Sequence, residues 1–218
     1  MTSDISPSPR GLLFLVTAPS AAGKDSVLRT LRSRGVDVAW VTTAVTRSPR
    51  PNEVDGRHHF FLQEDEFESR RQAGWFLETA IVYGRLYGTP IHQVSEPLET
   101  GADVVLRLDV QGARELQRRL PKSTVIFIEP PSVEEAERRI RERATESTEE
   151  VEQRLEAMHA YEMGFAQQAD YRVPNLTGEL EAVADHVWSI VVAERLRARP
   201  RTVDPNQLQA WTDAPFRP

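Results

Sequence analysis

The segment between residues 11 and 31 constrains the fold of this chain more than any other. Residues 11–17 (GLLFLVT) form a continuous apolar run, which is typical of a strand buried on both faces of a parallel sheet. A loop of small residues follows directly, and residues 27–31 then have helical spacing. This order predicts a phosphate-binding loop, because backbone N–H groups at a helix N-terminus bind anions.

The loop approximates the Walker A pattern G-x-x-x-x-G-K-[ST]. Gly23 and Lys24 match it, whereas Ala18 stands at the first glycine and Asp25 at the hydroxyl residue. Alanine tolerates positive φ poorly, so we expect Ala18 and Ala21 to use other backbone angles or to bear strain. A Gly-Lys turn that merely caps a helix is the alternative. The predicted ATP-binding loop comprises Ala18, Pro19, Ser20, Ala21, Ala22, Gly23, Lys24, Asp25 and Ser26.

The rest of the chain alternates between strand and helix patterns. Strands are predicted at 40–45, within 75–87, and at 102–109, 124–128 and 171–173, with helices at 64–73, 112–120, 132–168 and 179–197. Ser132 and Glu135 have the spacing of a capping box. The alternation predicts an α/β protein with a parallel, doubly wound sheet.

Composition limits the class of function. The chain has 218 residues, of which 39% are hydrophobic and 28% charged, as expected for one globular domain. It has no cysteine, which excludes disulfides, zinc-thiolate sites and a cysteine nucleophile. The formal net charge of −6 argues against nucleic-acid binding, and no apolar run approaches the ~20 residues that span a membrane. We therefore expect a cytoplasmic protein.

Several motifs occur together. TRSPRPNEVDG covers residues 46–56, YGRLYGTP covers 83–90, LDVQGA covers 108–113, and PPS covers 130–132. With the phosphate loop, they resemble guanylate kinase over about residues 11–197. This resemblance implies a P-loop NTPase core with a nucleoside-monophosphate-binding insert at about 41–94 and a helical lid at about 133–163. A flexible leader, 1–10, and a C-terminal tail, 198–218, flank this domain.

The resemblance also implies a reaction. Guanylate kinases transfer the γ-phosphate of ATP to GMP or dGMP with Mg²⁺, giving GDP and ADP, so the expected partners are small nucleotides. A monomer and a homodimer both remain open. Phosphoryl transfer requires mostly positioning and charge neutralisation, which accounts for the many arginines among the candidate residues.

Residues that match the family's acceptor site fall into two groups. Arg47, Arg50 and Tyr87 match groups on the GMP phosphate, and His59 stands where the family has a tyrosine. A histidine there can donate to phosphate, with a charge that depends on pH near neutrality. The base should be held by Glu78, which accepts from guanine N1–H and the exocyclic amine, and by two hydroxyl residues near O6, Thr43 and Thr89.

Further matches lie in the lid and beside the nucleotides. Arg139 and Arg143 are four residues apart and share a helix face, and Arg154 follows close to three turns later, so the three could close over the triphosphate. An exposed helix with ion pairs is the alternative. Asn175 matches an asparagine that borders adenine. The implied catalytic set is Lys24, Arg47, Arg139, Arg143, Arg154 and Asp109.

Arg107 departs most from the family, which usually has an acid there. Arg107 and Asp109 alternate along a predicted strand and therefore share one face at its carboxyl end. Arg107 could pair with Asp109, bind the GMP phosphate or repel Mg²⁺. Asp25 and Asp109 are the predicted metal ligands.

Two alternatives to an active guanylate kinase follow from these departures. One is a kinase of another small phosphorylated acceptor such as ribose 1,5-bisphosphate, whose kinase has a similar Gly-Lys-Asp-Ser loop. The other is a guanylate-kinase-like protein-binding module that has lost catalysis. Retention of Glu78, Arg47, Arg50 and Tyr87 speaks against the first, and retention of Lys24 speaks against the second.

Overall fold

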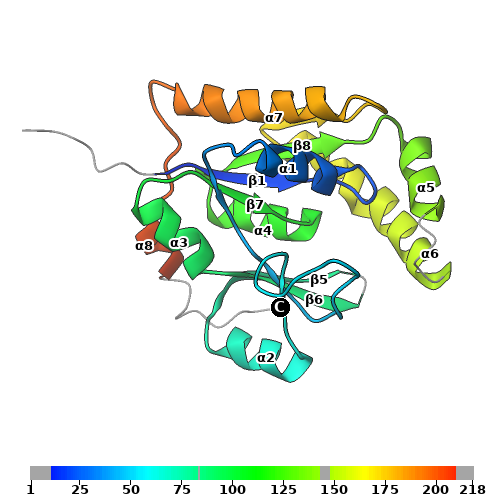
Figure 1. Ribbon diagram of the computed structural model, residues 1–218, viewed down its shortest axis with the longest axis horizontal. Helices are drawn as coiled ribbons and strands as arrows, with labels where there is room; N and C mark the ends of the chain where they lie inside the picture. Colours follow the sequence, from blue (N-terminus) through cyan, green and yellow to red (C-terminus); the bar gives the residue numbers. More distant parts are fainter. Residues whose placement is uncertain (1–10, 83, 143–147, 210–218) are drawn as a thin grey trace, which may run out of the picture.

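A parallel sheet forms the centre of the molecule. The computed structural model describes residues 11–82, 84–142 and 148–209. Within these residues, five strands pair in parallel, and the sheet confirms the predicted α/β class (Figure 1). In order across the sheet they are β2 (Ala39–Trp40), β7 (Val104–Arg107), β1 (Leu13–Thr17), β8 (Thr124–Glu129) and β9 (Tyr171–Pro174). The leader, residues 1–10, lies outside the described residues.

Helices cover both faces of this sheet (Figure 1). One face packs against α1 (Lys24–Ser33) and α7 (Leu180–Arg195); the other packs against α3 (His92–Glu99), α4 (Val110–Arg119) and α8 (Pro205–Gln209). Side chains of β1 alternate between these cores: Leu13 and Leu15 enter one, and Phe14 and Val16 enter the other. All four are fully buried, which explains why β1 is a continuous apolar run.

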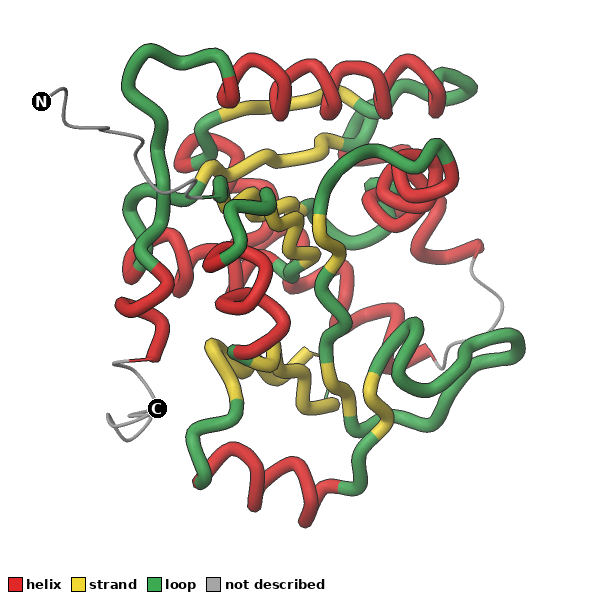
Figure 2. The backbone as a smooth tube through the Cα atoms, turned by 60° about the vertical axis from the view of Figure 1, so that its left-hand side comes forward, coloured by secondary structure: helices red, strands yellow, loops and turns green. Residues whose placement is uncertain are grey.

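A smaller sheet lies beside the central one, with α2 (Glu64–Gln72) across its outer face (Figure 2). Its four described strands, in order across the sheet, are β4 (Phe60–Phe61), β3 (Ala44–Val45), β6 (Arg85–Pro90) and β5 (Phe76–Val82). The sequence predicts one strand at 40–45, which is wrong. The segment is divided between β2 and β3, and residues 41–43 cross from one sheet to the other.

A helical arm follows β8. It consists of α5 (Val133–Glu142), α6 (Thr148–Ala157), a π-helical turn (Met158–Glu162) and a 3₁₀ segment (Met163–Gln168). The Glu135 N–H donates to Ser132 Oγ at 3.1 Å, so the predicted cap of α5 is confirmed. Ala136, Ile140 and Met158 form a separate buried cluster, and Val151 and Leu155 of α6 pack against it.

The C-terminal part of the described chain packs more closely than the sequence predicts. Thr202 forms an antiparallel bridge to Leu12, and Val203 and Leu208 are buried in the core under the central sheet. Part of the segment predicted as a tail from residue 198 therefore packs against the domain, while residues 210–218 lie outside the described chain. No helix among the described residues is long and apolar enough to cross a bilayer.

Gly88 is the tightest point of the smaller sheet. A Cβ atom there would lie 2.6 Å from Phe76 Cδ1 and 3.0 Å from Phe67 Cζ, two rings that stack at 4.4 Å. We expect Gly88→Ala to lower the free energy of unfolding by about 1–3 kcal/mol, because an overpacked core must rearrange. Chemical denaturation measures this change. The matched control is Gly164→Ala, where the added methyl meets no atom within 4 Å, so equal destabilisation of both variants would contradict the account.

Candidate active site

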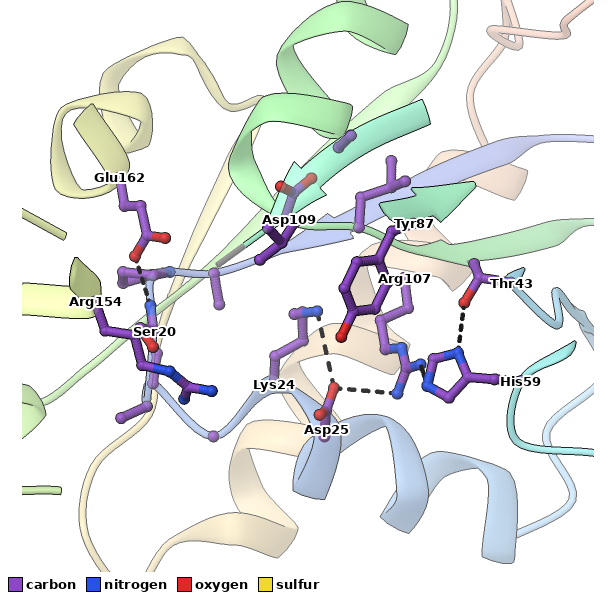
Figure 3. A pocket seen from close by; sticks show the side chains of 18 of the residues that line it. Ser20, Lys24, Asp25, Thr43, His59, Tyr87, Arg107, Asp109, Arg154 and Glu162 are labelled. Carbon is purple, nitrogen blue, oxygen red and sulfur yellow. Dashed lines mark hydrogen bonds and ion pairs between the residues drawn. The ribbon is translucent and has the colours of Figure 1, made fainter. Parts of the chain in front are cut away.

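A cleft of about 500 Å³ opens at the carboxyl ends of β1 and β7, where the central sheet meets the smaller one. This is where ligands bind in open α/β sheets. Most of the residues predicted for the site line the cleft, and Figure 3 shows ten of the lining residues with labels. The predicted residues that line it are Ala18, Pro19, Ser20, Ala21, Ala22, Gly23, Lys24, Asp25, Ser26, Thr43, Arg47, Arg50, His59, Glu78, Tyr87, Arg107, Asp109 and Arg154.

The loop after β1 ends at Gly23, whose φ of 88° places it in the left-handed region. Helix α1 begins at the next residue without a side-chain cap, and its first residues, Lys24, Asp25 and Ser26, line the cleft. Ala21 also has a positive φ, 59°, whereas Ala18 does not. The expected strain is therefore present at Ala21, because holding a non-glycine residue in the left-handed region costs roughly 1–2 kcal/mol. Ala18 uses ordinary backbone angles.

Asn175 supports this loop. Its Nδ2 donates to the Ala22 carbonyl at 2.6 Å, and a Cβ atom on Gly23 would clash with the same nitrogen. The side chain is buried and does not line the cleft. The resemblance implies a position beside adenine, whereas in the structure the amide holds the phosphate loop.

Lys24, Asp25 and Arg107 form a charged group in the cleft (Figure 3). Asp25 Oδ1 lies 3.8 Å from Lys24 Nζ and 3.5 Å from Arg107 Nη1. Burial lowers the pKa of Lys24, and the Asp25 charge opposes this shift. Of the roles considered for Arg107, pairing with Asp109 is not observed: its partners are Asp25 and His59.

His59 is buried between Arg107 and Thr43. Its Nε2 lies 2.9 Å from Arg107 Nη2, and its Nδ1 lies 3.0 Å from Thr43 Oγ1. Burial, followed by the positive charges of Arg107 and Arg47, lowers the pKa of His59 to about 3. The imidazole is therefore neutral at pH 7. The expectation that its charge changes near neutral pH is wrong.

Arg47 is fixed by a residue that sequence reasoning left without a role. Its Nη1 and Nη2 donate to Glu53 Oε2 and Oε1 at 2.6 and 2.8 Å, and the Arg50 N–H donates to the same carboxylate at 2.8 Å. The Arg47 hydrogen bonds lower the pKa of Glu53 to about 2. Glu53 belongs to the TRSPRPNEVDG motif, so its place six residues after Arg47 was the available signal.

Glu78 is a buried carboxyl that also lines the cleft. Thr89 Oγ1 donates to its Oε1 at 2.6 Å, although Thr89 itself does not line the cleft. Burial raises the pKa of Glu78 to about 8, to which the negative Asp109 and Glu115 add. Residues Glu78, Ala80 and Val82 alternate along β5 and all line the cleft.

Asp109 lies beside Glu78. Its Oδ1 accepts from the Gly112 N–H at 2.8 Å and so caps α4. A Cβ atom on Gly112 would lie 3.0 Å from both Asp109 Oδ1 and Glu78 Oε2, so the two carboxyls approach the same point. Asp25 lies on the other side of Lys24 (Figure 3). Among the described residues, no three histidines or acids are grouped so that they could hold a metal ion by themselves. The carboxylates of Asp25 and Asp109 both act on the charge of Lys24, which lies between them in this view.

Two of the three arginines predicted on the helical arm lie in the described residues, and one of them lines the cleft. Arg154 lines it, whereas Arg139 donates to Glu135 at 2.8 Å and to Thr177 at 3.0 Å, as in the ion-paired alternative. Arg143 lies outside the described residues. Sequence reasoning missed Glu162, a buried carboxylate that accepts from the Ser20 N–H at 2.7 Å. It ends a π-helical turn, which no local signal predicts.

The family model for guanylate kinase matches residues 10–191 of this chain. A guanylate kinase of Caldanaerobacter subterraneus is 38% identical over 188 residues, which are 86% of this chain and 90% of that protein. The chain belongs to the guanylate kinase family. The guanylate kinase of Rubrobacter xylanophilus is 46% identical over 146 residues, 67% of this chain and 76% of that protein.

The fold comparison agrees with this assignment to the guanylate kinases. The crystal structure of guanylate kinase from Anaplasma phagocytophilum superposes with a TM-score of 0.72 at 25% identity, covering 96% of this chain and 98% of that chain. The family predicted from the motifs is therefore confirmed. Guanylate kinases are ATP:GMP phosphotransferases. These relatives support neither a ribose 1,5-bisphosphate kinase nor a catalytically inactive binding module.

Proposed function

We propose that this chain is an active guanylate kinase, which transfers the γ-phosphate of ATP to GMP or dGMP. The observation that carries the proposal is that one cleft is lined both by the phosphate loop and by the buried Glu78, to which Thr89 donates. Arg47, Arg50 and Tyr87 line the same cleft. The proposal includes a cytoplasmic location and a monomeric or homodimeric state. It also includes action on nucleotides rather than nucleic acids, which the net charge of −6 supports.

The phosphate loop suits the donor nucleotide. The first N–H groups of α1 would hold the β- and γ-phosphates of ATP, and the Lys24 ammonium would face the outer phosphates. Arg154 would approach from the helical arm. In these roles the protein positions the triphosphate and neutralises charge as it develops.

Asp25 fits a Mg²⁺ that arrives with ATP. Its side chain is 60% exposed, lines the cleft and follows Lys24 directly. Nucleotide-bound Mg²⁺ usually takes one or two carboxylates and completes its shell with phosphate oxygens and water. When bound, it would neutralise phosphate charge. We assign only Asp25 to this role and place Asp109 with Glu78 at the acceptor base.

The part of the cleft around Glu78 suits guanine. An ionised Glu78 accepts from guanine N1–H and the exocyclic amine, whereas adenine has no donor at N1 and would leave the buried carboxylate without a partner. Arg47, held by Glu53, and Arg50 would bind the GMP phosphate, which fixes the acceptor oxygen in line with the γ-phosphate. Tyr87 would donate to the same phosphate.

Calorimetric titration of the folded chain with GMP and with ATP·Mg²⁺ tests the proposal. We expect both nucleotides to bind, since the cleft has a set of groups for each of them. Binding of ATP·Mg²⁺ without GMP would indicate a different acceptor. Binding of neither would favour a protein-binding module and contradict the proposal.

The raised pKa of Glu78 predicts that GMP binding releases a proton. At about pH 7.2 a carboxyl with a pKa of about 8 is mostly protonated, yet guanine requires the ionised form. GMP affinity should therefore rise about tenfold per pH unit below pH 8 and level off above it. The phosphate of GMP is already doubly ionised at this pH, because its second pKa is about 6.

Calorimetry in buffers of different ionisation enthalpy measures the number of protons released. We expect close to one proton for the unchanged chain and close to none for Glu78→Gln. Proton uptake on GMP binding, or equal release by both proteins, would contradict the assignment of Glu78 to the base.

A further inference from the structure

Four side chains form a continuous chain of contacts from the phosphate loop to the smaller sheet (Figure 3). Asp25 begins it, in the first turn of α1, and Arg107 continues it from the end of β7. His59 and Thr43 complete it, each one residue before a strand of the smaller sheet. We call these four residues the Asp25–Thr43 relay.

The relay has a fixed direction of hydrogen bonding. A guanidinium group only donates, so Arg107 Nη2 must donate to His59 Nε2, 2.9 Å away. A neutral imidazole has one acceptor nitrogen and one N–H, so the proton of His59 is on Nδ1. Thr43 Oγ1, 3.0 Å from Nδ1, cannot donate to that nitrogen and is the acceptor there.

The His59 ring has little freedom to escape this arrangement. It is 5% exposed, and the rings of Phe61 and Tyr87 lie edge-on to it at 5.7 and 6.2 Å. A ring flip would place carbon atoms against Arg107 and Thr43. Burial among the charges of Arg107 and Arg47 also keeps the imidazole neutral. Arg107 therefore determines which nitrogen carries the proton.

The consequence reaches the base through Thr43. Because Thr43 Oγ1 accepts from His59, its own hydroxyl proton remains for a group in the cleft, which Thr43 lines. Guanine O6 is an acceptor, whereas the 6-amino group of adenine is a donor. Without Arg107, His59 could hold its proton on Nε2, and the Thr43 hydroxyl would donate to Nδ1.

We infer that Arg107 is a positioning residue that makes the Thr43 hydroxyl a donor, through His59, and thereby favours a 6-oxo purine. The inference rests on the proposed function, since it deepens the specificity of the same acceptor site. Arg107 touches no base in this account. Its effect passes entirely through the proton of His59.

Nitrogen NMR of the histidine rings tests, without any nucleotide, whether Arg107 determines the tautomer of His59. The chain has five histidines, and the His59 signals are identified by their loss in His59→Phe. We expect His59 in the unchanged chain to be protonated on Nδ1 alone at neutral pH, and Arg107→Met to shift it toward a mixture of both tautomers. A charged His59, an Nε2–H tautomer, or no change in Arg107→Met would overturn the inference.

The affinities of acceptor nucleotides test whether the Thr43 hydroxyl donates to the base. 6-Thio-GMP differs from GMP at the 6-position, where sulfur is the weaker acceptor, and IMP differs only by lacking the 2-amino group. We expect Arg107→Met to lower the GMP to 6-thio-GMP affinity ratio about 3–10-fold, while the GMP to IMP ratio changes less than about twofold. His59→Phe should leave both ratios within about twofold, because a phenyl ring cannot accept the Thr43 hydroxyl proton. A general loss of phosphate binding or of fold would weaken all three nucleotides together.

Two further variants complete the design. Thr43→Val alone should lower the GMP to 6-thio-GMP affinity ratio, and the double variant Thr43→Val, Arg107→Met should show the same ratio as Thr43→Val. The matched control is Arg85→Met, an exposed arginine of the same sheet, which should leave both ratios unchanged. An additive effect in the double variant would overturn the inference. Failure of the unchanged chain to bind GMP would instead refute the proposed function, while the NMR result would stand separately.

Discussion

Substitution of Lys24 by methionine is expected to lower kcat for phosphoryl transfer to GMP by about 10²–10³. Lys24 begins α1 directly after the phosphate loop, and its ammonium lies in the cleft that holds the loop. Methionine keeps an unbranched stem of similar length but removes the charge that stabilises the transferring phosphoryl group. A coupled assay for ADP, at saturating ATP and GMP, measures the change.

The chain offers a matched control for this substitution. Lys122 is the only other lysine in the sequence, and it is exposed in the turn before β8. Lys122→Met should leave kcat within about twofold, because a surface charge far from the cleft contributes little. GMP binding should survive in Lys24→Met, since Lys24 serves the donor nucleotide. Equal turnover by the two variants would contradict the proposed role of Lys24.

Glu78→Gln is expected to reduce kcat/KM for GMP by on the order of 10³, and to stabilise the fold at the same time. A glutamine amide has one acceptor oxygen, and its NH₂ group would face a guanine donor. Stability should move in the opposite direction, because glutamine removes a carboxyl whose charged form is disfavoured by burial. Kinetics with GMP and chemical denaturation measure the two effects.

The gain in stability should depend on pH in a defined direction. The pKa of Glu78 rises from 4.5 to about 8 on folding, so its stabilising contribution is full below about pH 4.5 and is lost as pH approaches 8. Glu78→Gln should therefore be more stable than the unchanged chain near pH 8, by on the order of 2–4 kcal/mol, and similar to it near pH 5. Glu99→Gln, exposed on α3, is the control that should show no such trend. A gain that does not grow with pH would contradict a buried, proton-binding Glu78.

Features carried by consecutive residues were the ones that the sequence predicted correctly. The buried run of β1, the glycine before α1 and the alternation of strands and helices depend on local patterns, and the structure confirms all three. Most of the predicted site residues also line one cleft, because the motifs end strands whose carboxyl ends meet at one edge.

Features that depend on tertiary contacts were not predictable. Glu162 meets the Ser20 N–H across 142 residues, and Arg107 meets Asp25 across 82, so no spacing in the sequence indicates either pair. The depressed pKa of His59 requires burial between two arginines, which follows only from the packing of the smaller sheet on the central one. Burial of Val203 and Leu208 likewise depends on a surface supplied by α3 and the sheet.

The most direct test of the account is turnover with a panel of acceptors. ADP release is measured with ATP and Mg²⁺ in the presence of GMP, AMP, CMP, UMP or ribose 1,5-bisphosphate. The account predicts turnover with GMP and not with the others, because Glu78 requires donors at N1 and the exocyclic amine of the base. A folded sample that turns over another acceptor, or none, in place of GMP would contradict it.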